Sequence, residues 1–537
     1  MSPAIATTGL LNRFLESVKQ FPERPALDVD GAVLSYRELF DTSADAAAAL
    51  DAMLDMDRPA RVGVLAQRSL AMYQGILGTL LAGHTLVPLN PSFPTERSLA
   101  MVEQAGLAAV FVDAGSLQRL EELLASVSAG LVVVLPDTKL LEGLREHWPQ
   151  HTFVTVGDRL RPDDWNPALL EPDDLACLFF TSGSTGIPKG VGVLHRNVAR
   201  FVEMSLERYR DFGINETDRF SQFYDITFDS SMFDLYVSWA FGACLCCPSA
   251  KEWFNPNRYI ADKALTVIDI TPSAGHGMNR RNGWAPGRFP DLRLCRFGGE
   301  ALSAELAEAM AVAAPNAWID NAYGPTECTV DACFYRWDAE QSPAECEHGM
   351  VPIGYPGNQV ELRVADEALQ EVPVGSEGEL LISGPQVTPG YWKDPERTAQ
   401  AFVHLEDGRV HYRTGDLVRR PGPGEPIIFL GRLDHQIKIG GVRIELGEVE
   451  AALREAAGTD QAVAVGWPRT ESGASGIVAF VVAEGADEAA LRDRLRQRLP
   501  AVMVPRTIHS LENLPLNANG KVDRKALISD LEAAASR

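Results

Sequence analysis

Small and hydroxyl-bearing residues lie around a single lysine in the segment TSGSTGIPKG, residues 181–190. The apolar run Leu175–Phe180 before it predicts a buried strand that opens into a loop. Backbone N–H groups in such a loop can point at an anion, as they do in phosphate-binding nests. The ordinary P-loop is excluded because Pro188 precedes Lys189 and interrupts a helix. We interpret the segment as a phosphate-binding loop, against the alternative of a flexible Gly/Ser surface loop.

Two further segments carry groups suited to a nucleotide. NAYGPTE, residues 321–327, sets an aromatic ring beside a Gly-Pro turn, where it can stack on a flat base, and adds Glu327 as a hard oxygen ligand for Mg²⁺. YRTGDLV, residues 412–418, places Asp416 after a glycine at a strand end, where a carboxylate can accept both ribose hydroxyls. Arg432 offers a cation to the ribose and phosphates. Taken alone, each segment is also compatible with a plain turn.

A carboxylate lies in the apolar segment ITFDSSMFDLY, residues 226–236. Burying Asp229 there without a partner would be costly, and the ammonium group of a substrate would supply that partner. The alternative is that Asp229 caps the helix that follows. The segment therefore indicates either an amine-binding site or an ordinary helix N-terminus.

Taken together, these motifs resemble those of the adenylate-forming superfamily, which includes acyl-CoA synthetases, luciferases and the adenylation domains of nonribosomal peptide synthesis. The resemblance runs from LLAGHTLVPLNPSFP at residues 80–94 to Arg524, with GELLISGPQVTPGYW, GRLDHQIKIGGVRIELGEVE and NGKVDRKAL in the family order. It implies that an acid and ATP give an acyl adenylate and pyrophosphate, and that the acyl group is then transferred to a thiol.

The resemblance implies roles for the nucleotide-binding residues. Tyr323 would lie against adenine, Thr326 would contact the α-phosphate and Glu327 would hold Mg²⁺. Lys521, which is otherwise an ordinary surface lysine, would neutralise charge that develops as the carboxylate attacks the α-phosphate. The expected ATP-binding residues are Thr181, Ser182, Gly183, Ser184, Thr185, Gly186, Lys189, Gly299, Glu300, Ala301, Asn321, Tyr323, Gly324, Asp416 and Arg432.

The aspartate at position 229 resembles the amino-acid-activating branch. The implied substrate pocket consists of Asp229, Ser230, Phe233, Ser273, Arg296, Gly298, Ala322, Val330 and Asp331. With Phe233 as its floor, this pocket favours a small amino acid such as alanine, serine or glycine. Asp331 would either accept a hydrogen bond from a substrate hydroxyl or amide, or pair with Arg296; a free Arg296 would instead favour an acidic or β-amino acid. Related segments occur in D-alanine:carrier-protein ligases, which carry cysteine where this chain has Gly298.

The alternation of apolar strands with helices predicts an α/β protein with parallel sheets. We expect a large N-terminal domain, residues 1–433, of two helix-covered, mostly parallel sheets, with a small β-barrel-like subdomain at about 351–430. Residues 434–537 should form an α+β domain. The resemblance implies that this domain is mobile and rotates about a hinge at Asp434 between adenylation and thioester formation, with Gly440 and Gly441 in the loop that lines the second arrangement.

Bulk properties narrow the classes of partner. The 537 residues carry a net charge of −24, which argues against nucleic acid. Neither a signal peptide nor a membrane-spanning run of roughly 18–20 apolar residues is evident. The eight cysteines do not indicate a disulfide scaffold, and the Cys244/Cys247 spacing is more simply a buried strand than a metal site. We expect a cytoplasmic protein without nucleic-acid or membrane partners.

The acceptor thiol is expected to be the phosphopantetheine arm of a separate carrier protein, since no G-G-x-S segment follows Lys521 and no H-H-x-x-x-D-G signature is present. The predicted helix 487–499 is a candidate docking surface for an acidic carrier through Arg492, Arg494, Arg496 and Arg498. Its alternative is a solvated helix face. Other functions considered are an acyl- or aryl-CoA synthetase, a luciferase-like oxygenase and a non-catalytic homologue.

Overall fold

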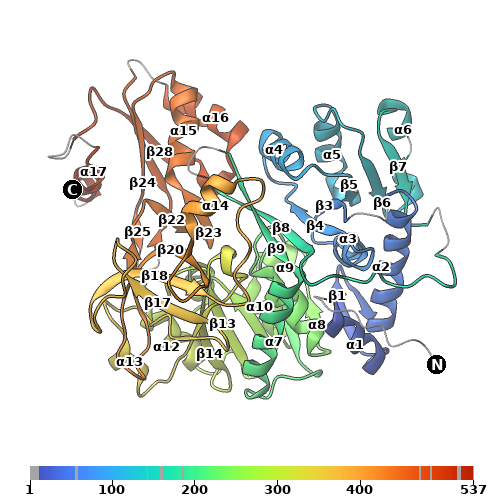
Figure 1. Ribbon diagram of the computed structural model, residues 1–537, viewed down its shortest axis with the longest axis horizontal. Helices are drawn as coiled ribbons and strands as arrows, with labels where there is room; N and C mark the ends of the chain where they lie inside the picture. Colours follow the sequence, from blue (N-terminus) through green and yellow to red (C-terminus); the bar gives the residue numbers. More distant parts are fainter. Residues whose placement is uncertain are drawn as a thin grey trace.

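The computed structural model describes residues 11–54, 59–141, 143–157, 161–183, 187–470, 473–483, 487–516 and 522–535. These residues form a large α/β body and a smaller C-terminal unit, which rises from the body at the upper left of Figure 1. The α/β class with helix-covered, mostly parallel sheets is confirmed.

The first sheet has seven strands, and all neighbours are parallel except its last pair. Helices cover both faces, because alternate side chains along strands such as β3 and β5 enter two different apolar clusters. The order is β7 (Thr152–Thr155), β6 (Val132–Leu135), β5 (Ala109–Val112), β3 (Arg61–Leu65), β4 (Thr85–Leu89), β8 (Leu175–Thr181) and β9 (Lys189–Leu194). The loop between β8 and β9 is the predicted phosphate-binding loop.

The second sheet has nine strands, with a parallel centre and antiparallel edges. Its order is β16 (Tyr355–Pro356), β15 (Cys333–Arg336), β14 (Trp318–Tyr323), β13 (Leu294–Gly298), β12 (Val267–Ile270), β10 (Arg219–Ser221), β11 (Cys244–Cys246), β1 (Pro25–Val29) and β2 (Ala32–Ser35). The carboxyl ends of β12, β13 and β14 open toward the C-terminal unit, which is where open α/β sheets bind ligands.

Helices pack against both sheets, and several begin at a clear cap. Ser35 accepts from the Glu38 N–H while the Glu38 carboxylate accepts from the Ser35 N–H, a capping box that starts α2. The helices of the body are α1 (Asn12–Gln20), α2 (Tyr36–Asp51), α3 (Leu70–Leu81), α4 (Thr95–Ala105), α5 (Leu117–Leu124), α6 (Leu144–His147), α7 (His195–Arg210), α8 (Ser238–Ala240), α9 (Ala250–Trp253), α10 (Pro256–Asp262), α11 (Pro272–Asn282), α12 (Ala304–Ala313), α13 (Ser342–Glu345) and α14 (Pro395–Ala401). Short helical turns are η1 (Ala114–Ser116), η2 (Thr138–Leu141), η3 (Phe233–Val237), η4 (Thr326–Cys328) and η5 (Ala501–Met503).

A third, antiparallel sheet follows the second. It consists of β17 (Glu361–Ala365), β18 (Glu377–Ser383), β19 (Phe402–His404), β20 (Val410–Arg419) and β21 (Ile428–Arg432). Its pairing is open rather than barrel-like, because β17 pairs only with β18 among the described strands. One face packs its apolar side chains into the core of the body, so burial is achieved without closure.

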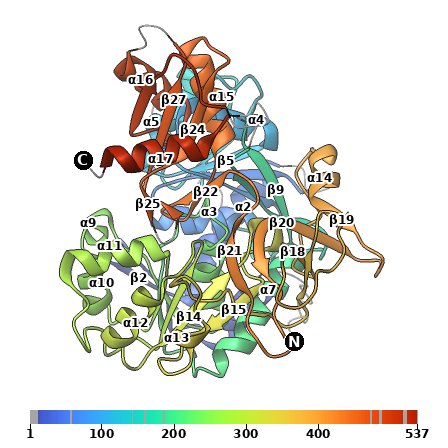
Figure 2. The same ribbon diagram turned by 90° about the vertical axis from the view of Figure 1, so that its left-hand side faces the viewer.

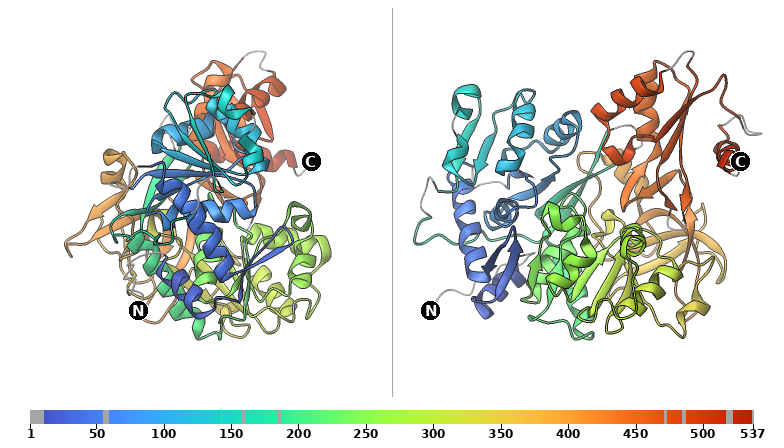
Figure 3. Two further views of the ribbon diagram at one scale, coloured as in Figure 1. Left: turned by 90° about the vertical axis from the view of Figure 1, so that its right-hand side faces the viewer. Right: turned by 180° about the vertical axis from the view of Figure 1, so that it is seen from behind.

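The C-terminal unit has its own core. A hairpin of β22 (Gln436–Ile439) and β23 (Val442–Glu445) leads into a three-stranded sheet with α15 and α16 on one face and α17 on the other (Figure 2). The remaining elements are α15 (Leu446–Ala457), β24 (Ala462–Gly466), β25 (Arg469–Thr470), β26 (Gly473–Ala474), β27 (Ile477–Val481), α16 (Glu488–Arg498), β28 (Thr507–Ser510) and α17 (Arg524–Ala535). Seen from behind, the C-terminal unit and strands β6 and β7 of the first sheet lie on opposite sides of the molecule (Figure 3). The unit contacts the body through the β22–β23 hairpin and through α16, which packs on α4. Among the described helices, none is long and apolar enough to cross a membrane.

Candidate active site

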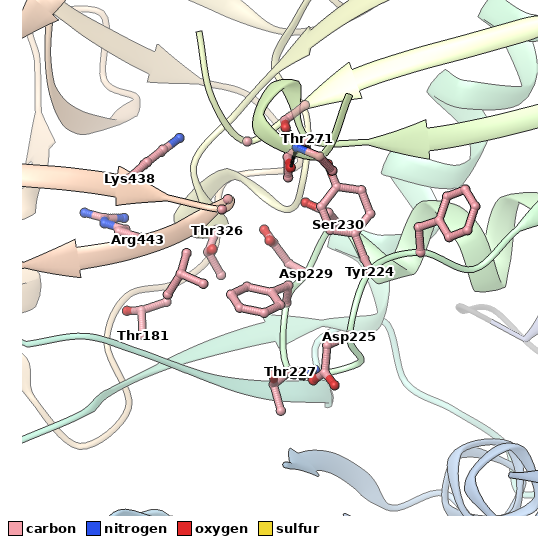
Figure 4. A pocket seen from close by; sticks show the side chains of 18 of the residues that line it. Thr181, Tyr224, Asp225, Thr227, Asp229, Ser230, Thr271, Thr326, Lys438 and Arg443 are labelled. Atoms are coloured by element: carbon pink, nitrogen blue, oxygen red, sulfur yellow. Dashed lines mark hydrogen bonds between the residues drawn. The ribbon is translucent and has the colours of Figure 1, made fainter. Parts of the chain in front are cut away.

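A cavity of about 530 Å³ lies between the carboxyl ends of β12, β13 and β14 and the β22–β23 hairpin. Residues far apart in the sequence meet here, and Figure 4 shows Asp229 pointing into the space between Thr326 and Ser230. The predicted site residues that line the cavity are Thr181, Ser182, Asp229, Ser230, Arg296, Gly298, Gly299, Ala322, Tyr323, Gly324, Thr326, Val330, Asp331, Asp416 and Arg432.

Other predicted residues lie just behind this lining. Phe233 packs beneath Arg296, and the Asn321 amide donates to the Pro352 carbonyl at 2.9 Å rather than facing the cavity. The remaining predicted residues outside the lining are Gly183, Lys189, Ser273, Glu300, Ala301 and Glu327. Four predicted positions, Ser184, Thr185, Gly186 and Lys521, lie outside the described residues.

The predicted ribose end is a chain of hydrogen-bonded groups. The Tyr323 hydroxyl donates to Asp416, and Arg432 donates to the other Asp416 oxygen at 2.6 Å. Arg432 also donates to both carboxylate oxygens of Asp434, at 2.7 and 2.6 Å. Gly415 is required beside them, since its φ is +70° and an added Cβ would lie 2.6 Å from the Arg432 guanidinium. The predicted ribose-binding residues are thus bonded directly to the predicted hinge residue.

Glu327 is a fully buried carboxylate surrounded by donors. Arg443 donates to its two oxygens at 3.1 and 2.8 Å, Tyr391 donates at 2.8 Å, and Lys189 Nζ lies 3.5 Å away. Burial alone would raise the pKa of Glu327, but Arg443 and Lys189 hold it well below its usual range. Burial lowers the pKa of Lys189 to about 8.

The chemistry of Glu327 fits a Mg²⁺ ligand. It is an ionised oxygen donor beside Thr326, which lines the cavity. Among the described residues, no group of three or more His, Cys, Asp or Glu side chains could hold a metal alone. A Mg²⁺ ion here would therefore rely on Glu327 together with ligands from ATP and water, which is the usual arrangement for this ion.

Asp229 is available for an ammonium group. Its Oδ2 atom is buried without a hydrogen-bond partner among the described residues, so it does not cap a helix. Burial raises the pKa of Asp229 to about 6, helped by the negative charges of Asp331 and Glu327 and opposed by the Thr326 hydroxyl. A substrate ammonium would satisfy this carboxylate, which supports the first of the two interpretations of the segment.

A buried row of charges underlies the pocket, and the sequence had not revealed it in full. Asp269, Arg296 and Asp320 are directly opposite one another on β12, β13 and β14. Arg296 forms ion pairs with both Asp269 and Asp331, and Phe233 lies 4.5 Å from its guanidinium carbon. Arg296 is therefore not free to face a substrate, and the condition that favoured an acidic substrate is not met. The signal for Asp269 was a lone carboxylate inside the apolar strand VIDI.

The β22–β23 hairpin closes the opposite wall. Lys438 and Arg443 line the cavity on this side (Figure 4), and the Gly441 N–H donates to Glu300 at 2.7 Å. Both cations lie within the motif GRLDHQIKIGGVRIE, but nothing in its spacing indicated that Arg443 would reach Glu327. The hairpin therefore adds positive charge beside the predicted phosphate and metal positions.

A second interdomain contact lies at the phosphate-binding loop. Glu448 at the start of α15 accepts from Arg97 of α4 at 2.5 Å and from the Gly183 N–H at 3.1 Å. Both side chains of the ion pair are buried. A carboxylate of the C-terminal unit thus occupies a backbone N–H of the loop that was predicted to bind phosphate.

Helix α17 contributes no residue to the lining of the cavity. Arg524 at the start of α17 pairs with Glu450 of α15 at 2.6 Å, and Leu527 packs against β24 and β27. Beyond Met503, no described residue lines the cavity. Helix α17 is therefore anchored to α15 and to the three-stranded sheet of the C-terminal unit.

The four arginines of α16 are all engaged within the chain. Arg492 pairs with Glu488, Arg494 donates to the Ala456 carbonyl at 2.7 Å, Arg496 pairs with Asp493, and Arg498 pairs with Glu455 and lies 3.5 Å from Glu96 of α4. Arg494 and Arg496 remain exposed, whereas Arg492 and Arg498 are half-buried.

Comparison with known proteins places these features in a family. The family model described as "AMP-binding enzyme" matches residues 14–392, and the one described as "AMP-binding enzyme C-terminal domain" matches residues 448–521. Tyrocidine synthase 3 of Brevibacillus parabrevis is 36% identical over 522 residues, which make up 96% of this chain and 7% of that protein. Tyrocidine synthase 1 of the same organism is 32% identical over 526 residues, 96% of this chain and 44% of that protein. The chain thus spans less than half the length of these curated relatives.

Solved structures agree along the whole chain. The Vibrio cholerae adenylation domain AlmE, in complex with glycyl-adenosine-5'-phosphate, matches with a TM-score of 0.87 and 31% identity over 99% of both chains. IdnL7 matches with a TM-score of 0.71 and 33% identity over 98% of this chain and 99% of that one. Because a family model covers more than half of the sequence and both parts of the fold are shared with an adenylation domain, this chain belongs to the AMP-binding enzyme family.

Proposed function

We propose that this chain activates a small amino acid with ATP and transfers the aminoacyl group to the phosphopantetheine thiol of a carrier protein. In the first step, a carboxylate oxygen of the amino acid attacks the α-phosphorus of ATP. The new acyl–phosphate bond forms as the bond to pyrophosphate breaks. In the second step, the thiolate attacks the acyl carbon and AMP leaves.

The observation that carries the proposal is the unpaired Asp229 oxygen in the cavity. An acyl- or aryl-CoA synthetase would bring an uncharged or aromatic group to this position and leave the carboxylate without a partner. An α-ammonium group neutralises it and fixes the substrate carboxylate toward Thr326. The similar structure of AlmE, which holds a glycyl adenylate, supports the same substrate class.

The residues of the other half of the cavity would hold the nucleotide. Tyr323 would stack on adenine, while Asp416 would accept the ribose hydroxyls, with Arg432 beside it. Mg²⁺, held by Glu327, would neutralise phosphate charge during the transfer. Cations that already face the α-phosphate before the reaction need not move as negative charge develops there. This preorganisation is a large contribution to the rate of the reaction.

The contacts of the C-terminal unit support a place for this arrangement after adenylation. Arg443 donates to Glu327, the carboxylate proposed to bind Mg²⁺, and Glu448 accepts from the Gly183 N–H of the predicted phosphate-binding loop. Both contacts compete with bound metal and pyrophosphate. We therefore assign this arrangement to the thiol-transfer step, with Lys521 serving the first step after the C-terminal unit rotates about Asp434.

The proposed acceptor of the aminoacyl group is a carrier protein. An artificially fused adenylation–carrier di-domain protein, NpsA-ThdA of Klebsiella oxytoca, shares the fold at a TM-score of 0.77 and 25% identity. On α16, Arg494 and Arg496 are the exposed cations that an acidic carrier would meet.

The reaction class is tested by trapping activated acids with hydroxylamine across amino, fatty and aryl acids, with Lys521→Ala beside the wild type. We expect ATP-dependent hydroxamate with at least one small amino acid, and its loss in the variant. Product with fatty or aryl acids alone would reject amino-acid activation. Product from the variant at the wild-type rate would reject the role of Lys521.

A further inference from the structure

Charged side chains of alternating sign cross four neighbouring strands of the second sheet. In strand order from β12 to β15 they are Asp269, Arg296, Asp320 and Arg336, and each is directly opposite the next. Directly opposite residues share one face of a sheet, so unlike charges meet along the row. The first three are buried, whereas Arg336 is exposed. Arg296 therefore has a buried carboxylate on the strand to either side of it.

Arg296 serves only one of these two neighbouring carboxylates. It forms ion pairs with Asp269 and with Asp331, and no ion pair between Arg296 and Asp320 is found among the described residues. The Nε–H group of Arg296 is buried and donates no hydrogen bond to the described residues, which is unfavourable. A turn of the guanidinium toward Asp320 would give that group an acceptor, at the expense of the present ion pairs.

Arg208 of α7 keeps Asp320 occupied. It donates to one carboxylate oxygen from Nε at 3.0 Å and to the other from Nη2, which is the two-pronged pairing that favours arginine over lysine. The Tyr209 hydroxyl adds a third hydrogen bond at 2.9 Å. The ring centroid of Phe334 lies 4.8 Å from the guanidinium carbon of Arg208. Asp320 therefore has its donors without Arg296.

The charges of this pair reach the active site from outside it. Arg208 lines a second cavity of about 500 Å³, and no described residue that lines this cavity also lines the active-site cavity. Asp331 does line the active-site cavity. Burial raises the pKa of Asp331, Arg296 and Arg208 oppose this rise, and the negative charge of Asp320 adds to it. Arg208 and Asp320 thus influence a carboxylate in the wall of a cavity that neither of them lines.

We propose that Arg208 is a positioning residue that helps to select the substrate. By holding Asp320, it leaves Arg296 to Asp331 and keeps the charge of that wall carboxylate neutralised. Without Arg208, the buried charge of Asp320 would have no cation, and Arg296 would turn to it. Asp331 would then present an uncompensated negative charge to the substrate. This inference rests on the proposed function and adds a residue outside the cavity to those that determine specificity.

The test compares two amino acids of similar size in ATP–pyrophosphate exchange. L-2,3-Diaminopropionate carries an amine where L-2-aminobutyrate carries a methyl group, and the specificity ratio is kcat/KM for the first divided by kcat/KM for the second. In Arg208→Met the ratio should rise at least about tenfold, because the amine gains a charged partner in Asp331. The KM for ATP should not change, because Arg208 lines no part of the active-site cavity. A ratio that stays at the wild-type value, including one that stays at zero, would overturn the inference.

Two matched variants separate positioning from a general loss of charge or stability. Arg336→Met removes the other guanidinium of the second cavity, which is also opposite Asp320 but lies 3.0 Å from the ring centroid of Trp318. Its specificity ratio should equal that of the wild type. In the double variant Arg208→Met/Asp320→Asn, the charge that attracts Arg296 is removed as well, so the ratio should return to the wild-type value. The same rise in Arg336→Met, or a rise that persists in the double variant, would overturn the inference.

Arg208→Lys decides the matter if Arg208→Met does not fold. A lysine keeps the charge but cannot donate to both carboxylate oxygens in the same fork, so the ratio should still rise, by at least about threefold. A wild-type ratio in Arg208→Lys would then overturn the inference. Unchanged ratios together with amino-acid-dependent exchange would leave the proposed function intact. Activity on fatty or aryl acids alone would overturn the proposed function, and this inference with it.

Discussion

At the scale of single residues, the site depends on carboxylates that differ only in their neighbours. Glu327 is surrounded by Arg443, Lys189 and Tyr391 and stays ionised. No cation of the described residues contributes to the pKa shift of Asp229, and burial raises that pKa to about 6. The first is suited to a metal ion, while the second is suited to the ammonium group of a substrate. The surroundings thus suit the same side-chain type to two different proposed roles.

The raised pKa of Asp229 predicts a pH dependence for amino-acid capture. Only the ionised carboxylate attracts an ammonium group, so kcat/KM for the amino acid should fall about tenfold per pH unit below a pH of about 6. The bound ammonium stabilises the ionised form, so kcat should decline at lower pH than kcat/KM does. The groups that face Asp229 are Asp331, Glu327, the Thr326 hydroxyl and the Val330 N–H.

The measurement is the pH profile of pyrophosphate exchange between about pH 5 and 8. Asp269 also titrates in this interval, since burial raises its pKa to about 7. Asp269→Asn therefore serves as the control and should retain the acid limb, whereas Asp229→Asn should lose it. A wild-type profile that is level down to pH 5 would contradict the assignment of Asp229.

At the scale of elements, the β22–β23 hairpin joins the C-terminal unit to the proposed metal site. Gly440 and Gly441 have φ values of +61° and +79° and allow the tight turn that brings Lys438 and Arg443 to one side. Arg443 then reaches Glu327, which follows the end of β14. The Arg443 guanidinium and Mg²⁺ would compete for the Glu327 carboxylate. The position of the β22–β23 hairpin would therefore change the affinity of the site for Mg²⁺.

This competition predicts opposite effects of Arg443→Ala on the two half-reactions. Removing the guanidinium leaves Glu327 with Lys189 as its cation, so Mg²⁺ should half-saturate pyrophosphate exchange at a concentration several-fold lower than in the wild type. Transfer of the aminoacyl group to a carrier should slow by at least about tenfold, because the hairpin loses its buried ion pair with the body. Single-turnover carrier loading and a Mg²⁺ titration of exchange measure the two effects.

Arg469→Ala is the control of equal charge change, since Arg469 is an exposed residue of the C-terminal unit. It should alter neither measurement. If Arg443→Ala slows both half-reactions equally and leaves the Mg²⁺ requirement unchanged, the hairpin does not act through Glu327.

At the scale of the whole molecule, two units with separate apolar cores share one cavity. The C-terminal unit has its own apolar core, and its contacts with the body include the ion pairs of Arg443 with Glu327 and of Glu448 with Arg97. Contacts of this kind can exchange for water or ligand without exposing apolar core. The architecture is therefore compatible with the proposed rotation of the C-terminal unit between the two half-reactions.

Much of this arrangement could be predicted from the sequence, because apolar strands that end in glycine-rich loops have strong local patterns. The loop after β8 and the aspartate at 229 were found in this way. Asp269 and Arg443 were not assigned, because their roles depend on strands and a hairpin from distant parts of the chain. The amide of Asn321 was assigned to the nucleotide but bonds the Pro352 carbonyl, a choice that only packing decides.

The central claim is that Asp229 makes this an amino-acid-activating enzyme. The most direct measurement is ATP–pyrophosphate exchange with the preferred amino acid and with its desamino analogue, in the wild type and in Asp229→Ala. We predict that kcat/KM of the wild type is at least about 100-fold higher for the amino acid than for the analogue. The variant should lose this preference mainly because its kcat/KM for the amino acid falls. Equal exchange with both acids in the wild type, or an unchanged preference in the variant, would contradict the account.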